Sequence, residues 1–131
     1  MQRARHPAPL PEPPKYDIGE LHTPPAPIVD VTTSDGGIVV TWDMKLQPNL
    51  RYSPADKYQI FTYTEGEQPP STDLWRNIGT INALPLPMAV TLCSYKRGFR
   101  YYFAVRGLDR ENRYGAFNEP KSVDLREITV L

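Results

Sequence analysis

The sequence predicts an all-β fold in which seven strands form two antiparallel sheets, packed face to face as a sandwich. Three observations predict it. Short segments rich in β-branched and aromatic residues recur at regular spacing, with glycine, proline and asparagine between them. Within these segments large apolar side chains alternate with small or polar ones, as they do on a sheet with one buried face. No segment combines a sustained helical period with capping residues, so no long helix is expected.

The strand pattern appears in seven segments. They are residues 28–33, 38–42, 57–64, 75–81, 88–92, 99–108 and 117–125. The glycine-rich segment 34–37 joins the first two as a hairpin, and residues 96–98 and 112–115 supply further turns. The other connections are polar loops that contain proline, a residue that a central strand does not accommodate.

The alternation also identifies the core face of each strand. In segment 99–108, Tyr101, Phe103 and Val105 share one face, and Tyr58 and Ile60 share a face of segment 57–64. The expected core consists of Trp42, Tyr58, Ile60, Leu92, Tyr101, Phe103 and Val105.

A proline-rich arm precedes the domain. Eight of the 15 prolines lie within the first 27 residues, where they remove backbone donors and disfavour helix. We therefore expect residues 1–26 to be a largely irregular arm, residues 27–126 to form the domain and residues 127–131 to be a tail. The segment 11–14 has the composition of a ligand for a proline-binding domain, although a plain linker is the simpler interpretation.

Composition excludes several classes of function. The 15 basic and 15 acidic residues give no net charge, which argues against nucleic acid or an anionic membrane as the partner. No apolar run is long enough to span a bilayer, and no secretory signal is expected from the first residues. A single cysteine and no glycosylation sequon favour a reducing compartment, either the nucleus or the cytosol.

No catalytic chemistry is expected. The two histidines lie in the arm and Cys93 stands alone, at the rim of the core or pointing away from it, so neither a metal nor another cofactor has a set of ligands. Asp109, Arg110 and Glu111 have the composition of a catalytic group, but they lie in a turn where solvated side chains are expected. The chain is therefore predicted not to be an enzyme.

Aromatic residues remain once the core is filled. If Tyr58 and Tyr101 point inward, the alternate residues of the same two strands point outward and share one face. The candidate partner-binding residues are Phe61, Tyr63, Trp75, Tyr102, Ala104 and Arg106. Exposed aromatics beside an arginine suit a face that binds a short hydrophobic segment, lying across it or added as an edge strand. Alternatively, a strand, the loops or the arm cover these side chains.

The order of the aromatic residues resembles that of fibronectin type III domains, which have an immunoglobulin-like sandwich. The resemblance assigns Trp42 to the second strand, Tyr58 to the third, and Tyr101 to a tyrosine corner whose hydroxyl bonds the backbone upstream. A narrower match comes from the string Ala-Leu-Pro-Leu-Pro-Met-Ala at 83–89 and the corner at 113–117, where Ala116 stands in place of a proline. These residues resemble the C-terminal domain of the activating-transcription-factor-interacting protein family, which includes Windei.

The narrower resemblance implies a docking module of a nuclear chromatin and transcription cofactor. It implies a methyl-CpG-binding-type protein as partner, and association of the full-length protein with a SETDB-type histone methyltransferase in heterochromatin silencing. The domain itself is expected to be a monomer. The competing functions are an extracellular adhesion or receptor module, which the same fold serves, and a passive spacer without an exposed apolar patch.

Overall fold

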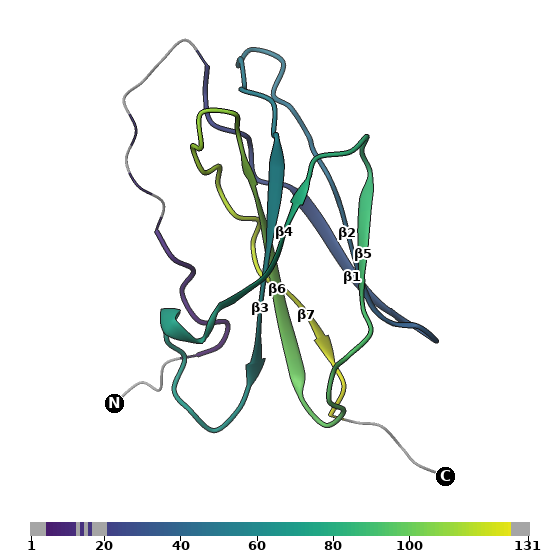
Figure 1. Cartoon of the computed structure of the whole chain (residues 1–131). Coiled ribbons are helices and arrows are strands. Elements are labelled where there is room, and N and C mark those ends of the chain that lie inside the picture. Colours follow the sequence, from purple (N-terminus) through teal and green to yellow (C-terminus); the bar gives the residue numbers. More distant parts are fainter. Residues whose placement is uncertain (1–4, 13, 15, 17–20, 127–131) are drawn as a thin grey trace.

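A computed structural model describes residues 5–12, 14, 16 and 21–126, and it shows two antiparallel sheets packed face to face (Figure 1). One sheet has the order β1-β2-β5, with β1 at Ile28–Ser34, β2 at Gly37–Asp43 and β5 at Met88–Leu92. The other has the order β4-β3-β6-β7, with β4 at Arg76–Asn82, β3 at Lys57–Glu65, β6 at Arg100–Leu108 and β7 at Lys121–Asp124. The predicted fold class is therefore confirmed.

The last strand is the element that differs most from its prediction. It was expected to begin near residue 117 but begins at Lys121. Asn118 explains the difference, because its side-chain Oδ1 accepts the Val105 backbone N–H at 2.7 Å, a donor that a neighbouring strand would otherwise pair. Pro120 then lacks an N–H for the ladder. One short 3-10 helix, η1 at Thr72–Leu74, lies within the loop between β3 and β4.

The inner core lies between the two sheets and is the one that alternation predicted. Trp42, Phe103 and Val105 are at most 1% exposed, and Tyr58, Ile60 and Tyr101 are also buried. Leu92 is only half-buried, because it is the last residue of β5 at the edge of its sheet. The tyrosine corner is present, since the Tyr101 hydroxyl accepts the Lys96 backbone N–H at 2.7 Å.

The chain just before β1 packs tightly against the loop end of β6. Pro24 is fully buried, and Gly115 lies so close that a Cβ there would stand 2.2 Å from the Pro24 carbonyl oxygen. His22 also exchanges backbone hydrogen bonds with Arg51 and Ser53, at 2.8 and 2.7 Å. The close approach requires glycine at position 115. The boundary between arm and domain after residue 26 remains a prediction.

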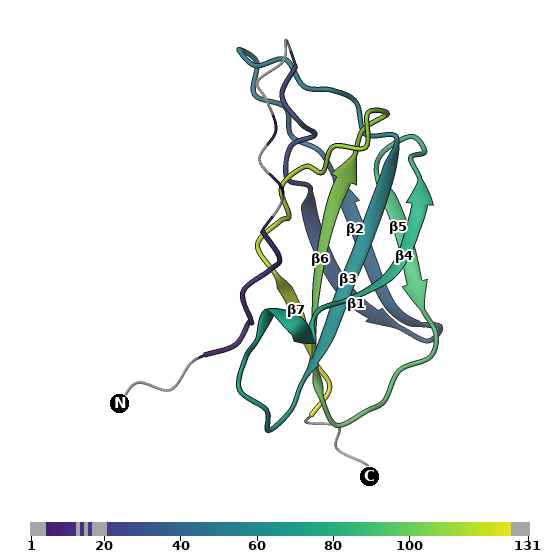
Figure 2. The same cartoon turned by 60° about the vertical axis from the view of Figure 1, so that its left-hand side comes forward.

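Regular secondary structure is absent from residues 5–12, 14 and 16 of the arm, the part described before residue 21. Figures 1 and 2 nevertheless show the segment from residue 5 onward, drawn in purple, beside η1 in both views. No helix in the described part of the chain is long and apolar enough to cross a membrane.

Candidate partner-binding face

The pairing of β3 with β6 sets the positions of the predicted face. Phe61 pairs with Ala104 and Tyr63 with Tyr102, so these four side chains share the outer side of the four-stranded sheet. Trp75 comes directly before β4, and its ring meets that of Tyr63 edge-on at a centroid distance of 4.7 Å. The residues that the sequence predicted to lie together therefore do so.

Of the two alternatives, exposure is wrong, and cover by the arm and a loop is confirmed. Each of the six predicted residues is at most 9% exposed. Two segments cover them: arm residues Ala8 and Leu10 join the cluster from one side, and Phe117 joins it from the other. We call this assembly the outer aromatic cluster, and it consists of Phe61, Tyr63, Trp75, Tyr102 and Ala104 with Ala8, Leu10, Leu74 and Phe117 packed against them. Its role in binding a partner stays a prediction.

Hydrogen bonds hold the arm to the cluster through its backbone. The Ala8 N–H donates to the Tyr63 hydroxyl at 2.7 Å, and the Ala8 carbonyl accepts the Trp75 Nε1–H at 3.1 Å. His6 Nδ1 lies 2.8 Å from the same Tyr63 hydroxyl. A hydroxyl has one proton and two lone pairs, so it can donate to His6 while accepting from Ala8. Both polar groups of the Ala8 backbone are thus satisfied by aromatic side chains.

The two tyrosines form a stacked pair. Their ring centroids are 5.0 Å apart with an interplanar angle of 15°, and the His6 ring stacks on Tyr102 at 6.1 Å. Tyr102 donates its hydroxyl proton to Glu65 Oε1 at 2.8 Å. Burial raises the pKa of Tyr63 to about 12 and raises the pKa of Tyr102. Both phenols therefore keep their protons near neutral pH, as their donor roles require.

Arg106 is not the exposed charged anchor that the sequence predicted. Its guanidinium lies 3.9 Å from the Tyr114 ring centroid, 4.7 Å from that of Phe117 and 5.2 Å from that of Phe61. Its Nε–H donates to Gln59 Oε1 at 2.8 Å, and burial lowers its pKa. Such contacts stabilise a desolvated arginine through the quadrupoles of the rings. Arg106 therefore binds the segment 114–117 to the sheet.

Asp109 was expected to be solvated in a turn, but the structure shows it buried. Its carboxylate is buried and accepts the backbone N–H groups of Glu111 and Arg113, both at 2.9 Å, and the Arg113 Nε–H at 2.8 Å. Burial alone would raise its pKa, but the hydrogen bonds and charge of Arg113 outweigh burial and lower it. Asp109 thus organises the turn before the segment 114–117. The described residues contain no group of three or more His, Cys, Asp or Glu placed to hold a metal ion.

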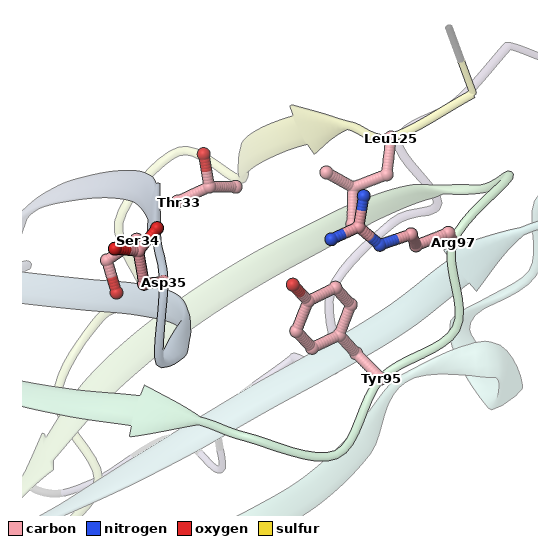
Figure 3. Close-up of a pocket in the computed structure, with 6 residues that line it drawn as sticks. All are labelled: Thr33, Ser34, Asp35, Tyr95, Arg97 and Leu125. Carbon is pink, nitrogen blue, oxygen red and sulfur yellow. The ribbon is translucent and has the colours of Figure 1, made fainter. Parts of the chain in front are cut away.

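Among the hollows that lie away from the outer aromatic cluster, two are at opposite ends of the sandwich. Figure 3 shows the first, about 310 Å³, in which Tyr95, Arg97 and Leu125 face the Thr33–Asp35 end of the β1–β2 hairpin. The second, about 360 Å³, lies among the loops at the opposite end and is apolar. Leu46 and Leu84 line it and are 61% and 64% exposed. This patch was not among the predicted binding residues, although leucines in proline-containing loops, outside any strand, are a signal for one.

The two-sheet topology, the tyrosine corner and the aromatic core together define a fibronectin type III domain. The sequence model of the family described as "Fibronectin-III type domain" matches residues 22–122, and the chain belongs to this family.

Relatives within the family are longer proteins. The chain is 39% identical over 92 residues to human activating transcription factor 7-interacting protein 1, and 38% identical over 92 residues to the chicken protein of that name. It is 40% identical over 88 residues to human activating transcription factor 7-interacting protein 2. These matches cover 70%, 70% and 66% of this chain but only 7%, 8% and 12% of the relatives. They confirm the narrower resemblance.

Solved structures share the fold at low sequence identity. A structure titled "Myokine structure" matches with a TM-score of 0.57 and 18% identity, covering 78% of this chain and 97% of that one. A cytokine receptor complex matches with a TM-score of 0.54 and 18% identity, covering 81% of this chain and 54% of that one. At this identity the likeness shows the fold alone.

Proposed function

We propose that this chain is a protein–protein docking module of a nuclear chromatin and transcription cofactor, and that a short hydrophobic segment of its partner binds the outer aromatic cluster. One observation carries the proposal. The cluster already holds a short extended segment of the chain itself, through both polar groups of the Ala8 backbone and through apolar contact. A surface that binds one such segment has the chemistry to bind another.

The relatives supply the biological setting of the proposal. Their printed names describe proteins that interact with an activating transcription factor. Because the chain spans only 7–12% of these relatives, the nuclear location, the methyl-CpG-binding-type partner and the association with a SETDB-type methyltransferase in heterochromatin silencing are part of the proposal. The module itself supplies binding, and the proposal gives it no catalytic step.

The manner in which the arm is held favours docking across the face over addition of an edge strand. Residues 5–12 form no strand, and Ala8 bonds to side chains of Tyr63 and Trp75 instead of to a strand backbone. Strand addition would use main-chain pairing along β4 or β7, the edges of this sheet. The partner segment therefore takes the place of the arm over β3 and β6.

The test is a titration of the chain with a purified methyl-CpG-binding-type protein. Trp75→Phe keeps an aromatic ring but removes the Nε1–H that also holds the arm, so it is compared within a chain whose arm is excluded by Ala8→Glu. In that chain we expect it to weaken binding by about tenfold, which corresponds to about 1.5 kcal/mol for one hydrogen bond. Leu84→Ala, on the exposed loop patch, is the matched control and should bind as the wild type does. If Leu84→Ala abolishes binding and Trp75→Phe does not, the partner uses the loop patch and the proposed site is wrong.

A further inference from the structure

The arm contacts the outer aromatic cluster with every second residue. His6 and Leu10 are half-buried and Ala8 is buried, whereas Pro7 and Pro9 are exposed. The chain bends at His6 and Pro7, and from Ala8 to Leu10 the alternation is that of an extended chain with one side against a surface. The side facing the cluster therefore presents an imidazole, a methyl group and an isobutyl group in sequence.

We infer that the outer aromatic cluster is a selective receptor for an extended segment in which an alanine lies between two prolines and an aliphatic residue follows two positions later. Residues 6–10 of this chain are its resident occupant, and a partner segment of the same form displaces them. The inference deepens the proposed function and rests on it for the existence of a partner. What it adds is the chemistry of the segment and the competition with the arm.

Selectivity for a small residue follows from the burial at its centre. Ala8 is 2% exposed, and Ala104 on the sheet beneath is fully buried. Tyr63 and Trp75 bond the Ala8 backbone on both sides, so the chain cannot move away to admit a longer side chain. A longer side chain has to break these bonds, and a charged one has in addition to lose its hydration.

The flanking prolines suit the site for two reasons. Proline has no backbone N–H, so Pro7 and Pro9 bring no unpaired donor to an apolar surface. Proline also restricts the free chain to extended conformations, which reduces the entropy lost on binding. The central residue, in contrast, must have an N–H, because the Tyr63 hydroxyl accepts it. A third proline at the central position is therefore excluded.

Displacement is possible because few bonds hold the arm. Ala8 makes two hydrogen bonds to the cluster, and His6 has a further contact with Tyr63. The arm reaches the site as a tethered ligand, so its effective concentration is of the order of millimolar. A partner segment in trans therefore binds more weakly to the wild-type chain than to a chain whose own arm is excluded.

The experiment uses the full chain with Ala8→Glu, which excludes the arm, and Glu12→Gln as the matched control at an exposed arm position outside residues 6–10. The probe is a synthetic peptide with the sequence of residues 5–12, together with the same peptide carrying glutamate in place of its alanine. Binding is followed through the NMR signal of the Trp75 indole N–H. We expect the peptide to bind Ala8→Glu about tenfold or more tighter than wild type or Glu12→Gln, because the tethered competitor is gone. The glutamate peptide should bind none of them.

Three results overturn the inference. Equal affinity of Ala8→Glu for the two peptides would show that the site does not select alanine. Equal affinity of wild type and Ala8→Glu for the alanine peptide would show that the arm does not compete for the site. A dimer of the wild type in sedimentation that becomes a monomer in Ala8→Glu means that the occupant comes from a second copy. Ala8→Val, a milder change, repeats the comparison if Ala8→Glu unfolds the chain, and there a partial loss of arm binding is expected.

The two proposals fail in different ways. If the peptide binds as expected but no methyl-CpG-binding-type protein competes with it, the receptor chemistry stands and the proposed function is wrong. If such a protein binds without displacing the peptide, docking stands at another surface and the inference is wrong.

Discussion

The inner core and the outer aromatic cluster lie on opposite sides of the same sheet, and both exclude water. Strands of two hydrogen-bonded sheets enclose the inner core around Trp42 and Phe103. The outer cluster is enclosed by β3 and β6 on one side and, on the other, by an arm segment that pairs with no strand. Burial alone therefore does not tell a permanent core from the occupied binding surface that we propose. The two can be distinguished by which segment covers the surface and by the bonds that hold that segment.

The difference between the inner core and the outer aromatic cluster is also seen in the hydrogen bonds of two tyrosines. The Tyr101 hydroxyl accepts a backbone N–H five positions away, from Lys96, within one strand connection. The Tyr63 hydroxyl accepts the N–H of Ala8, 55 positions away. The first bond closes a short loop of the domain, whereas the second closes a long one and holds a separate segment. Loss of the second bond should release the arm and leave the sandwich folded.

The largest effect is expected in the inner core. Trp42→Ala should lower the free energy of unfolding by about 3–5 kcal/mol, because the cavity lies in a layer closed on both sides. Urea denaturation measures the change. A loss below about 1 kcal/mol would show that the inner core relaxes as freely as a surface.

A matched pair of hydroxyl deletions should separate the two regions. Tyr63→Phe and Tyr101→Phe should each lower the free energy of unfolding by about 0.5–1.5 kcal/mol, the usual net contribution of one hydrogen bond. Only Tyr63→Phe should accelerate amide exchange at Ala8, since only that hydroxyl holds the arm. Equal exchange at Ala8 in both variants would contradict the separate roles.

The pH dependence tests the burial of Tyr63. Its pKa is raised from 10.0 to about 12 in the folded chain, chiefly by burial. The stability that the neutral phenol contributes is therefore complete below pH 10 and is lost as the pH rises towards 12. An ultraviolet titration of wild type and Ala8→Glu should show the tyrosine ionisation at lower pH in the variant, where the arm no longer covers Tyr63. Identical titrations would mean that the arm adds nothing to its burial.

The smallest effect provides the baseline for these comparisons. Cys93 is exposed and belongs to neither cluster. Cys93→Ser should change the free energy of unfolding by no more than about 0.5 kcal/mol. A larger change in urea denaturation would reveal a packing role that the structure does not contain.

Period-two alternation was sufficient to predict both faces of β3 and β6. It placed Tyr58 and Ile60 inward and Phe61 and Tyr63 on the opposite side, as the structure has them. This succeeded because alternation is a local property of a strand. The strand ends were also predicted well, except where the Asn118 side chain replaces the ladder beside Val105.

The cover of the outer face could not be predicted in the same way. Its central residue is Ala8, a small side chain between prolines, which gives no periodic apolar signal and is typical of a linker. The interaction joins residues 55 positions apart and depends on one hydroxyl and one indole N–H. The burial of Arg106 was not predicted for a related reason, because the rings of Tyr114 and Phe117 fold back over it from a loop.

Native-state amide exchange of Ala8 and Tyr58 in one sample tests the central claim most directly. The arm should open without unfolding of the sandwich, so exchange at Ala8 should be slowed yet insensitive to low concentrations of urea. Tyr58, in the inner core and paired on both sides with β4 and β6, should exchange only through global unfolding, and its opening free energy should fall steeply with urea. If the two amides instead share one opening free energy and one urea slope, the outer aromatic cluster is a permanent core and the arm is not a displaceable occupant.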